Sequence, residues 1–190
     1  MRHYFFIIIK IVFVFLLSGC KDSQSEIANT ISKMQASRVS IPFDKMSCWI
    51  NDSLQNYCPW EKAKLKLVVY TDSFACSQCT LKKMYLWKDF VRMEKKYNNK
   101  FYIFFIIQSG SNCTSALSSY FHYTELNHPM YIDSTNIFKK ENPNIPSEEM
   151  FHVFLLDEND STKVSHIYKH TQMPDCQQIV KMLISIRQNA

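Results

Sequence analysis

The feature that most constrains this chain is a strand-like segment followed at once by two cysteines at the start of a helical pattern. Residues 65–70 form an apolar run rich in β-branched side chains, which stops at the polar residues 71–73. Cys76 and Cys79 then open a stretch whose apolar side chains have helical spacing. A strand that delivers two cysteines to the first turn of a helix is the layout of a dithiol redox site.

The predicted positions of Cys76 and Cys79 favour thiolate chemistry. Unpaired N–H groups and the positive end of the helix dipole meet the first cysteine, so we expect the pKa of its thiol to be lowered and thiolate to be available near neutral pH. The second cysteine follows one turn later on the same face, close enough to close a disulfide. The sequence therefore predicts a site at which a dithiol and a disulfide interconvert.

The first twenty residues are predicted to be a leader that ends in a modified cysteine. Residues 4–17 are apolar apart from Lys10, which fits the hydrophobic region of a secretory signal and is too short for a comfortable membrane span. The ending, Leu-Ser-Gly-Cys at residues 17–20, resembles the lipobox of bacterial lipoproteins. That resemblance implies that residues 1–19 are removed and that Cys20 carries a lipid. The alternative is an N-terminal transmembrane anchor with an incidental cysteine.

The charge of the chain gives no support to nucleic-acid binding. The 22 Lys and Arg stand against 17 Asp and Glu, and loss of Arg2 and Lys10 with the leader leaves a net charge of +3. No basic cluster is interleaved with aromatic side chains, as a nucleic-acid groove would require.

The cysteine count points to an oxidising compartment. Of the 7 cysteines, Cys20 is assigned to the lipid, and the remaining even number favours disulfides in an exported protein. Only Cys76 and Cys79 have a local geometric reason to pair. Cys113 and Cys176 either pair with each other or stay as buried thiols.

Cys48 and Cys58 lie on either side of a turn signal at residues 51–53, and two short strands are predicted around that turn. A structural disulfide between the two arms is one interpretation. Burial of Cys48 as a small hydrophobic residue is the other.

The rest of the chain reads as one domain of ordinary size. Residues 20–40 are predicted to be a polar tether, helical from about 26 to 36. After the cysteines, residues 80–96 have the pattern of an amphipathic helix, with Tyr85 on its apolar side and Glu94 among its polar positions. The later elements are expected to be a buried parallel strand at 101–108, a weaker helix at 115–126, a strand at 130–133, a helical turn at 136–140, a hairpin of strands at 151–156 and 163–170, and a closing helix at 174–187.

This order of elements is that of the thioredoxin fold. The chain resembles the thioredoxin-like lipoproteins of Gram-negative bacteria, close to the TlpA/ResA type of thiol–disulfide oxidoreductase. The resemblance is carried by VVYTDSFACSQC at 68–79, FYIFFII at 101–107 and FHVFLLDEND at 151–160. It implies an α/β domain over residues 41–190 with a short N-terminal extension, and a thioredoxin-like fold with a mixed central sheet flanked by helices.

The same resemblance assigns roles to individual residues. Cys76 would attack a disulfide of a partner protein and Cys79 would resolve the mixed disulfide, with no cofactor and no metal. Phe74 would supply an apolar docking surface. Phe151 matches the position of the family's cis-proline, where a trans peptide is the default for a non-proline residue. His152 follows it and would then lie near the dithiol, although a packed or solvent-facing strand histidine is the simpler expectation.

Two positions depart from the family pattern. Tyr70 stands where a buried acid is common, and Asp72, nearer the cysteines, is expected to point to solvent. The Ser-Gln pair between the cysteines leaves the direction of electron flow open. The location implied is the cell envelope, with the lipid on Cys20 held in a membrane, the outer membrane by preference, and the domain facing the periplasm or the cell surface.

Three other functions compete with the oxidoreductase. One is a lipid-anchored binding or assembly module with a structural Cys76–Cys79 disulfide, whose exposed aromatics and the loop with His122 and His128 face a partner. A thiol peroxidase would require threonine and proline where Ser73 and Val69 stand. A zinc site would combine the cysteine pair with the other two cysteines near residue 50 or with the two histidines. Replacing Cys76 by serine separates the enzyme from the binding module.

Overall fold

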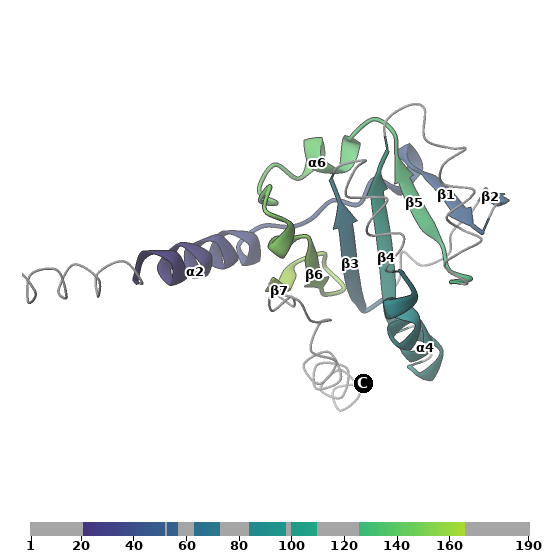
Figure 1. Cartoon of the computed structure of the whole chain (residues 1–190), viewed down its shortest axis with the longest axis horizontal. Coiled ribbons are helices and arrows are strands. Elements are labelled where there is room, and N and C mark those ends of the chain that lie inside the picture. Colours follow the sequence, from purple (N-terminus) through teal and green to yellow (C-terminus); the bar gives the residue numbers. More distant parts are fainter. Residues whose placement is uncertain are drawn as a thin grey trace, which may run out of the picture.

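The computed structural model describes residues 21–51, 53–56, 63–72, 84–97, 100–109 and 126–165. These residues form a mixed sheet of seven strands in the order β2-β1-β5-β4-β3-β6-β7 (Figure 1). The strands are β1 (Ser47–Ile50), β2 (Ser53–Gln55), β3 (Leu65–Thr71), β4 (Phe101–Gln108), β5 (Met130–Asp133), β6 (Val153–Leu156) and β7 (Thr162–Ser165). The helical elements are α2 (Lys21–Gln35), η1 (Phe43–Lys45), η3 (Met84–Trp87), α4 (Lys88–Lys96), α6 (Ile137–Glu141) and η4 (Glu149–Phe151).

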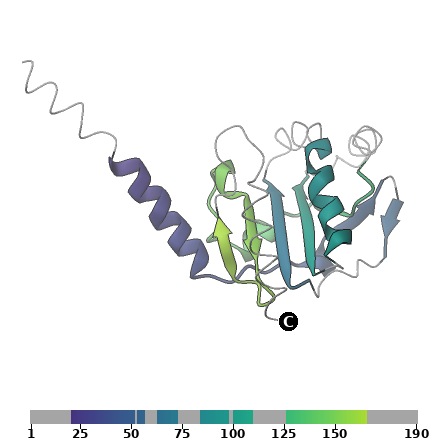
Figure 2. The same cartoon turned by 90° about the horizontal axis from the view of Figure 1, so that it is seen from below.

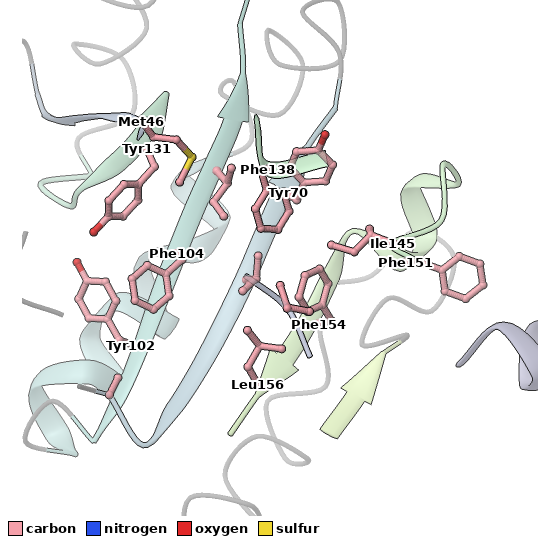
Figure 3. Close-up of a cluster of buried hydrophobic side chains, with 14 of the residues drawn as sticks. Met46, Tyr70, Tyr102, Phe104, Tyr131, Phe138, Ile145, Phe151, Phe154 and Leu156 are labelled. Carbon is pink, nitrogen blue, oxygen red and sulfur yellow. The ribbon is translucent and has the colours of Figure 1, made fainter. Parts of the chain in front are cut away.

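The central strands are parallel and buried on both faces. β4 pairs in parallel with β3 on one side and with β5 on the other. Successive residues of a strand point to opposite faces, so the continuous apolar run of β4 contributes to two cores. The α4-side core contains Ile103, Phe105, Trp87 and Phe90, and the α6-side core contains Tyr70, Phe104, Tyr131, Phe138, Phe151 and Phe154 (Figure 3). The predictions of a buried parallel strand at 101–108 and a strand at 130–133 are confirmed.

The helix predicted at 80–96 is described from Met84 onward and begins as the 3-10 turn η3 before α4. Its buried side chains include Met84, Trp87 and Phe90, which face the α4-side core. The expectation that Tyr85 lies on the apolar side is wrong, because its side chain is 56% exposed. The 3-10 geometry of η3 explains the difference, since three residues per turn align Met84 with Trp87 and turn Tyr85 outward.

β6 and β7 complete the part of the sheet next to β3. β6 pairs antiparallel with β3, and β7 pairs antiparallel with β6. The predicted hairpin is therefore confirmed, but its first strand begins at Val153 rather than at residue 151. Residues before it close a 3-10 turn instead, in which the N–H of Phe151 donates to the carbonyl of Glu148 at 3.0 Å.

The order β4-β3-β6-β7, with β4 parallel and β6 antiparallel to β3, is the strand arrangement of the thioredoxin-like fold. The predicted α/β class, with a mixed central sheet and helices, is confirmed. β5, β1 and β2 extend the sheet beyond β4.

The predicted turn at 51–53 joins two antiparallel strands, β1 and β2. Asn51 has a φ of 52°, a left-handed conformation that asparagine tolerates better than most residues. β1 also pairs antiparallel with β5, which fixes the hairpin to the sheet.

The segment predicted as a tether is helical over α2, longer than the predicted 26–36, and projects from the domain (Figures 1 and 2). The second half of the helix belongs to the packed domain, because Met34 is buried in the α6-side core and Ile27 and Ile31 pack against that core. The chain that follows is fastened by the side-chain amide of Asn142, which accepts from the N–H of Ser40 at 2.8 Å and donates to its carbonyl at 2.7 Å. Within the part of the chain that the structure describes, no helix combines the length and the apolar character needed to cross a membrane.

Candidate active site

The two cysteines predicted to carry the chemistry follow directly from the end of β3. Cys76, Cys79 and Phe74 lie outside the described residues, as does the predicted lipid-bearing Cys20. Asp72 is the last described residue before them. Only three residues separate Asp72 from Cys76, so chain length alone keeps their Cα atoms within about 14 Å of each other.

The described part of the site is the edge of the sheet at which β3, β4 and β5 end. Tyr70 and Asp72 lie at the end of β3, and Asp133 is the last residue of β5. β6 runs antiparallel to β3, so its amino end and the preceding His152 come to the same edge. The N–H of Tyr70 donates to the carbonyl of His152 at 2.9 Å, which ties the two segments together.

His152 is a packed histidine at this edge. Its side chain is buried, its Nε2 lies 2.9 Å from the carbonyl oxygen of Pro146, and its ring centroid lies 5.0 Å from that of Tyr70. Burial lowers the pKa of His152 and outweighs the Pro146 carbonyl, Asp72 and Glu149, which act in the opposite direction. The imidazole is therefore neutral at pH 7, with its Nε2–H donated to Pro146.

Asp72 faces His152 rather than pointing wholly to solvent, so the expectation for this residue is wrong. Its Oδ2 lies 3.9 Å from Nε2 of His152, and its side chain is 28% exposed. The carboxylate thus has one side toward the buried imidazole of His152, beyond hydrogen-bond distance, and one side toward water. The sequence does not show this, because the contact depends on the pairing of β3 with β6, whose segments are some eighty residues apart.

Tyr70 occupies the place where the resemblance would put a buried acid. The residue is buried, and its hydroxyl has no hydrogen-bond partner among the described residues. Burial raises the pKa of the Tyr70 phenol well above its ordinary value, and Asp72 and Asp133 raise it further. Tyr70 is therefore a neutral phenol beside Phe138, with ring centroids 4.8 Å apart, and does not replace the carboxylate (Figure 3).

Asp133 is the other carboxylate at this edge, and its role is structural. It is fully buried, and Oδ1 accepts from the N–H groups of Thr135 at 3.2 Å and Ile137 at 2.9 Å. Oδ2 accepts from the N–H of Phe138 at 2.9 Å. These bonds satisfy the otherwise unpaired donors at the start of α6.

The predicted docking residues Phe151 and His152 do not offer free main-chain donors in this conformation. The N–H of Phe151 donates to Glu148 and that of His152 to Glu149, each at 3.0 Å. The described residues contain no cis peptide bond, and the Phe151 ring is buried in the α6-side core. In this conformation the Phe151 ring is therefore not accessible to a partner protein. The docking roles of Phe74, Phe151 and His152 stay predictions.

We expect the neutral, buried His152 to make the stability of the protein depend on pH. The unfolded chain binds a proton on this histidine near pH 6.5, whereas the lowered pKa keeps the folded form neutral. The free energy of unfolding should therefore be highest above pH 6.5 and fall as the pH drops below it, with a slope of at most about 1.4 kcal/mol per pH unit.

Urea denaturation at a series of pH values measures this slope. His152→Gln keeps a donor for the Pro146 carbonyl but does not titrate, so the difference between wild type and this variant isolates the histidine. Equal slopes for the two proteins between pH 5 and 6.5 would contradict the assignment of a neutral buried imidazole.

His128 is not placed to face a partner or to bind zinc as the alternative functions supposed. It is buried, with Nδ1 3.0 Å from the carbonyl oxygen of Pro129 and Nε2 2.9 and 3.1 Å from the two carboxyl oxygens of Glu94. Oε1 of Glu94 also accepts from the N–H of Ile103 at 2.7 Å. His122 lies outside the described residues. Among the residues that are described, no group of three or more His, Cys, Asp and Glu could hold a metal ion.

Cys48 is buried and disulfide-bonded, so the disulfide interpretation of this residue is confirmed over that of a free buried thiol. Its partner lies outside the described residues, because Cys48 is the only cysteine within them. Its pairing with Cys58 stays a prediction.

No protein-family model matches the sequence, and no curated protein matches it. Among solved structures, the chain is similar to the mitochondrial 2-Cys peroxiredoxin from Plasmodium falciparum, with 11% identity, a TM-score of 0.48, and coverage of 74% of this chain and 88% of that one. It is also similar to the bacterioferritin comigratory protein of Xanthomonas campestris, with 8% identity, a TM-score of 0.48, and coverage of 80% and 97%.

A thioredoxin-like protein from Bacteroides caccae matches with 12% identity, a TM-score of 0.41, and coverage of 65% of this chain and 40% of that one. Identities this low and TM-scores below 0.5 say nothing about the activity of this chain. Its own strand order and strand directions show that it has a thioredoxin-like fold.

Proposed function

We propose that this protein is a thiol–disulfide oxidoreductase of the cell envelope that exchanges disulfides with partner proteins through Cys76 and Cys79. One observation carries the proposal. The Cys-Ser-Gln-Cys sequence begins five residues after Thr71, the last residue of β3, and β3 is the strand of a thioredoxin-like arrangement that ends at the same edge as the parallel strands β4 and β5. Sites in sheets with parallel strands gather at that edge because the loops after several strands converge there.

The reaction needs no cofactor. The thiolate of Cys76 attacks one sulfur of a partner's disulfide, a mixed disulfide forms, and the partner's other sulfur leaves as a thiolate that takes up a proton. Cys79 then attacks Cys76, which closes the Cys76–Cys79 disulfide and releases the partner in its reduced, dithiol form. The two electrons pass from the Cys76/Cys79 dithiol to the partner. The reverse sequence donates the disulfide.

The lipid on Cys20 is part of the proposal. α2 begins at Lys21, immediately after the modified residue, and its 15 residues extend about 22 Å. The part of the helix before Ile27 would hold the sheet away from the membrane surface, while the part from Ile27 to Met34 packs against the domain. The partners are then protein disulfides or dithiols within reach of the anchored domain, in the periplasm or at the cell surface.

The experiment that tests the proposal is a protein-disulfide exchange assay with three proteins: wild type, Cys76→Ser and Cys79→Ser. Insulin serves as the disulfide substrate, and a reducing dithiol returns the enzyme to its starting state. The proposal requires turnover by wild type and none by Cys76→Ser. With the reducing dithiol removed after the protein has been reduced, it also requires a trapped covalent complex with Cys79→Ser.

A further inference from the structure

Two opposite edges of the sheet can be told apart by their residues. Asp72 and His152 lie at the edge where β3 ends and β6 begins, which we call the site edge. The turn between β6 and β7 lies beside the start of β3, because β6 is antiparallel to β3 and pairs Leu156 with Lys66. We call this opposite edge the turn edge. The 7 residues of β3 separate the two edges by about 20 Å.

The C-terminal end of α2 lies at the turn edge. Shortly after the helix, Arg38 forms a β-bridge with Ser161. The N–H of Val39 then donates to the carbonyl of Asp160 at 2.9 Å. Both partners belong to the turn between β6 and β7, so the base of the helix is held at this turn.

The chain that follows α2 is also bound to α6 and the residue after it. The main chain of Ser40 exchanges two hydrogen bonds with the side-chain amide of Asn142, and its hydroxyl donates to Glu141 at 2.9 Å. Nζ of Lys45 lies 2.6 Å from the other oxygen of the Glu141 carboxylate. These contacts fix the segment from which α2 leaves the domain.

From the turn edge, α2 runs back along β7 toward the site edge. The helix contacts β7, and Ile27, Ile31 and Met34 pack on the α6-side core. β7 is antiparallel to β6, so it points from the turn edge to the site edge. Figure 2 shows the helix rising from the base of β7 in the direction in which the arrows of β3 and β7 point. The first residue of α2 therefore lies on the site-edge side of the domain.

The packed part of α2 leaves little free helix between the domain and a lipid on Cys20. The residues of the helix before Ile27 extend only about 9 Å. A membrane that holds this lipid would therefore lie close to the domain, on the side to which the first residue of α2 points.

We propose that the site edge faces the membrane to which the protein is anchored, and that its partners carry their disulfides or dithiols close to that membrane surface. The inference rests on the proposed function, which supplies both the lipid and the exchange reaction. It restricts the partner class to membrane proteins with cysteines near the headgroups, since a soluble partner would have to enter the space between the domain and the membrane.

Exposed lysines lie at the other edge of the sheet. Lys64 and Lys100 directly precede β3 and β4, so an anionic membrane that bound them would contact the turn edge. Attraction between exposed charges is screened within about 10 Å at physiological salt. The covalent anchor, held by the packing of α2, determines the orientation instead.

Energy transfer measures which edge faces the membrane. A fluorescent amino acid replaces either Ser147 or Glu158 in the full, lipidated chain, and vesicles of phosphatidylethanolamine and phosphatidylglycerol carry an acceptor on their headgroups. Both residues are exposed, Ser147 before β6 at the site edge and Glu158 in the turn edge. We expect the donor at residue 147 to lie closer to the headgroups by up to about 20 Å, the length of β3. Equal transfer, or stronger transfer from residue 158, would overturn the inference.

A pair of variants tests the role of α2. Ile31→Asp places a charge between the helix and the core, so the difference between the two donors should disappear. Asn29→Asp adds the same charge on the exposed side of the helix and should preserve the difference. Insulin reduction in solution checks that the domain of each variant is folded. A difference that survives in a folded Ile31→Asp would overturn the role of helix packing.

The partner class is tested with a disulfide peptide attached to a lipid headgroup in the same vesicles. Its linker has either three residues, reaching about 10 Å, or twenty, reaching up to about 70 Å. A site edge that faces the membrane should reduce both peptides at rates within about threefold of each other. A site edge that faces away lies about 30 Å from the surface and would reduce only the peptide on the long linker.

The outcomes separate this inference from the proposed function. Loss of exchange with the short linker alone would overturn the inference and leave the proposed function standing. A chain that reduces neither peptide nor insulin, or that does not bind vesicles, would contradict the proposed function and with it the inference.

Discussion

Replacement of Cys76 by serine is expected to slow the reduction of insulin by at least about a hundredfold, to the rate of the reducing dithiol alone. A serine hydroxyl is a far weaker nucleophile than a thiolate at neutral pH, so the first bond to the partner does not form. Cys79→Ser removes only the resolving step. That variant should form the mixed disulfide once and then stop, leaving one partner chain attached to Cys76.

Non-reducing gels and mass spectrometry distinguish these outcomes. The trapped complex with Cys79→Ser should disappear on addition of a reductant. It should not form with the variant that carries both Cys76→Ser and Cys79→Ser. Cys113→Ser is the matched control, because it removes one thiol outside the motif. Insulin reduction by Cys76→Ser at the wild-type rate would contradict the proposed function and favour a binding module with a structural disulfide.

The largest effect on stability is expected from Glu94→Ala. Glu94 is buried on α4, accepts from the N–H of Ile103 at 2.7 Å, and lies 2.9 Å from Nε2 of His128. Ile103 precedes the point at which β5 joins β4, at the Phe105–Met130 pair, so the side chain takes the place of a strand partner. Alanine leaves two buried polar groups unpaired, which should lower the free energy of unfolding by about 3–5 kcal/mol.

Glu94→Gln separates the hydrogen bonds from the charge. Its amide oxygen can accept from the N–H of Ile103 and its amide nitrogen can lie against Nε2 of His128, so we expect a loss of only about 1 kcal/mol. Asp89→Ala, on an exposed face of the same helix, should change the stability by less than about 1 kcal/mol. Urea denaturation measures all three. Equal losses for the alanine and glutamine variants of Glu94 would show that packing, not hydrogen bonding, sets its contribution.

The elements that the sequence predicted best are those whose pattern is local. The run Phe101–Gln108 is too apolar to have a solvent-facing side, which identifies a strand between two cores. The turn at Asn51 and the strand Met130–Asp133 are likewise marked by their own residues. These elements, taken in order with the cysteine motif, were sufficient to predict the thioredoxin-like arrangement.

The polar contacts inside the cores could not be predicted in the same way, because each joins distant segments. Lys66 lies in an otherwise apolar strand and is buried, with its ammonium 2.5 Å from Asp160 in the turn after β6. Glu94 looked like an ordinary polar helix position, although it lies four residues after the buried Phe90 and seven after Trp87. That spacing was the available signal that it faces the core.

The candidate site likewise combines features that the local sequence predicts with contacts that depend on distant segments. The chain order places Cys76 and Cys79 after β3 without any knowledge of distant residues. The approach of Asp72 to His152 depends on the antiparallel pairing of β3 with β6, and on a 3-10 turn that delays the start of β6 by two residues. Neither follows from the local pattern around residue 151, which is apolar enough to continue a strand.

The central claim, that Cys76 and Cys79 form an exchangeable pair and not a structural disulfide, is tested most directly by their reduction potential. Equilibration of the full chain with glutathione or dithiothreitol buffers, followed by alkylation and mass spectrometry of the peptide that contains both cysteines, gives this value. We predict a potential between about −270 and −120 mV, the span from thioredoxin to strongly oxidising dithiol proteins. A potential below about −300 mV, where structural disulfides lie, would contradict the claim.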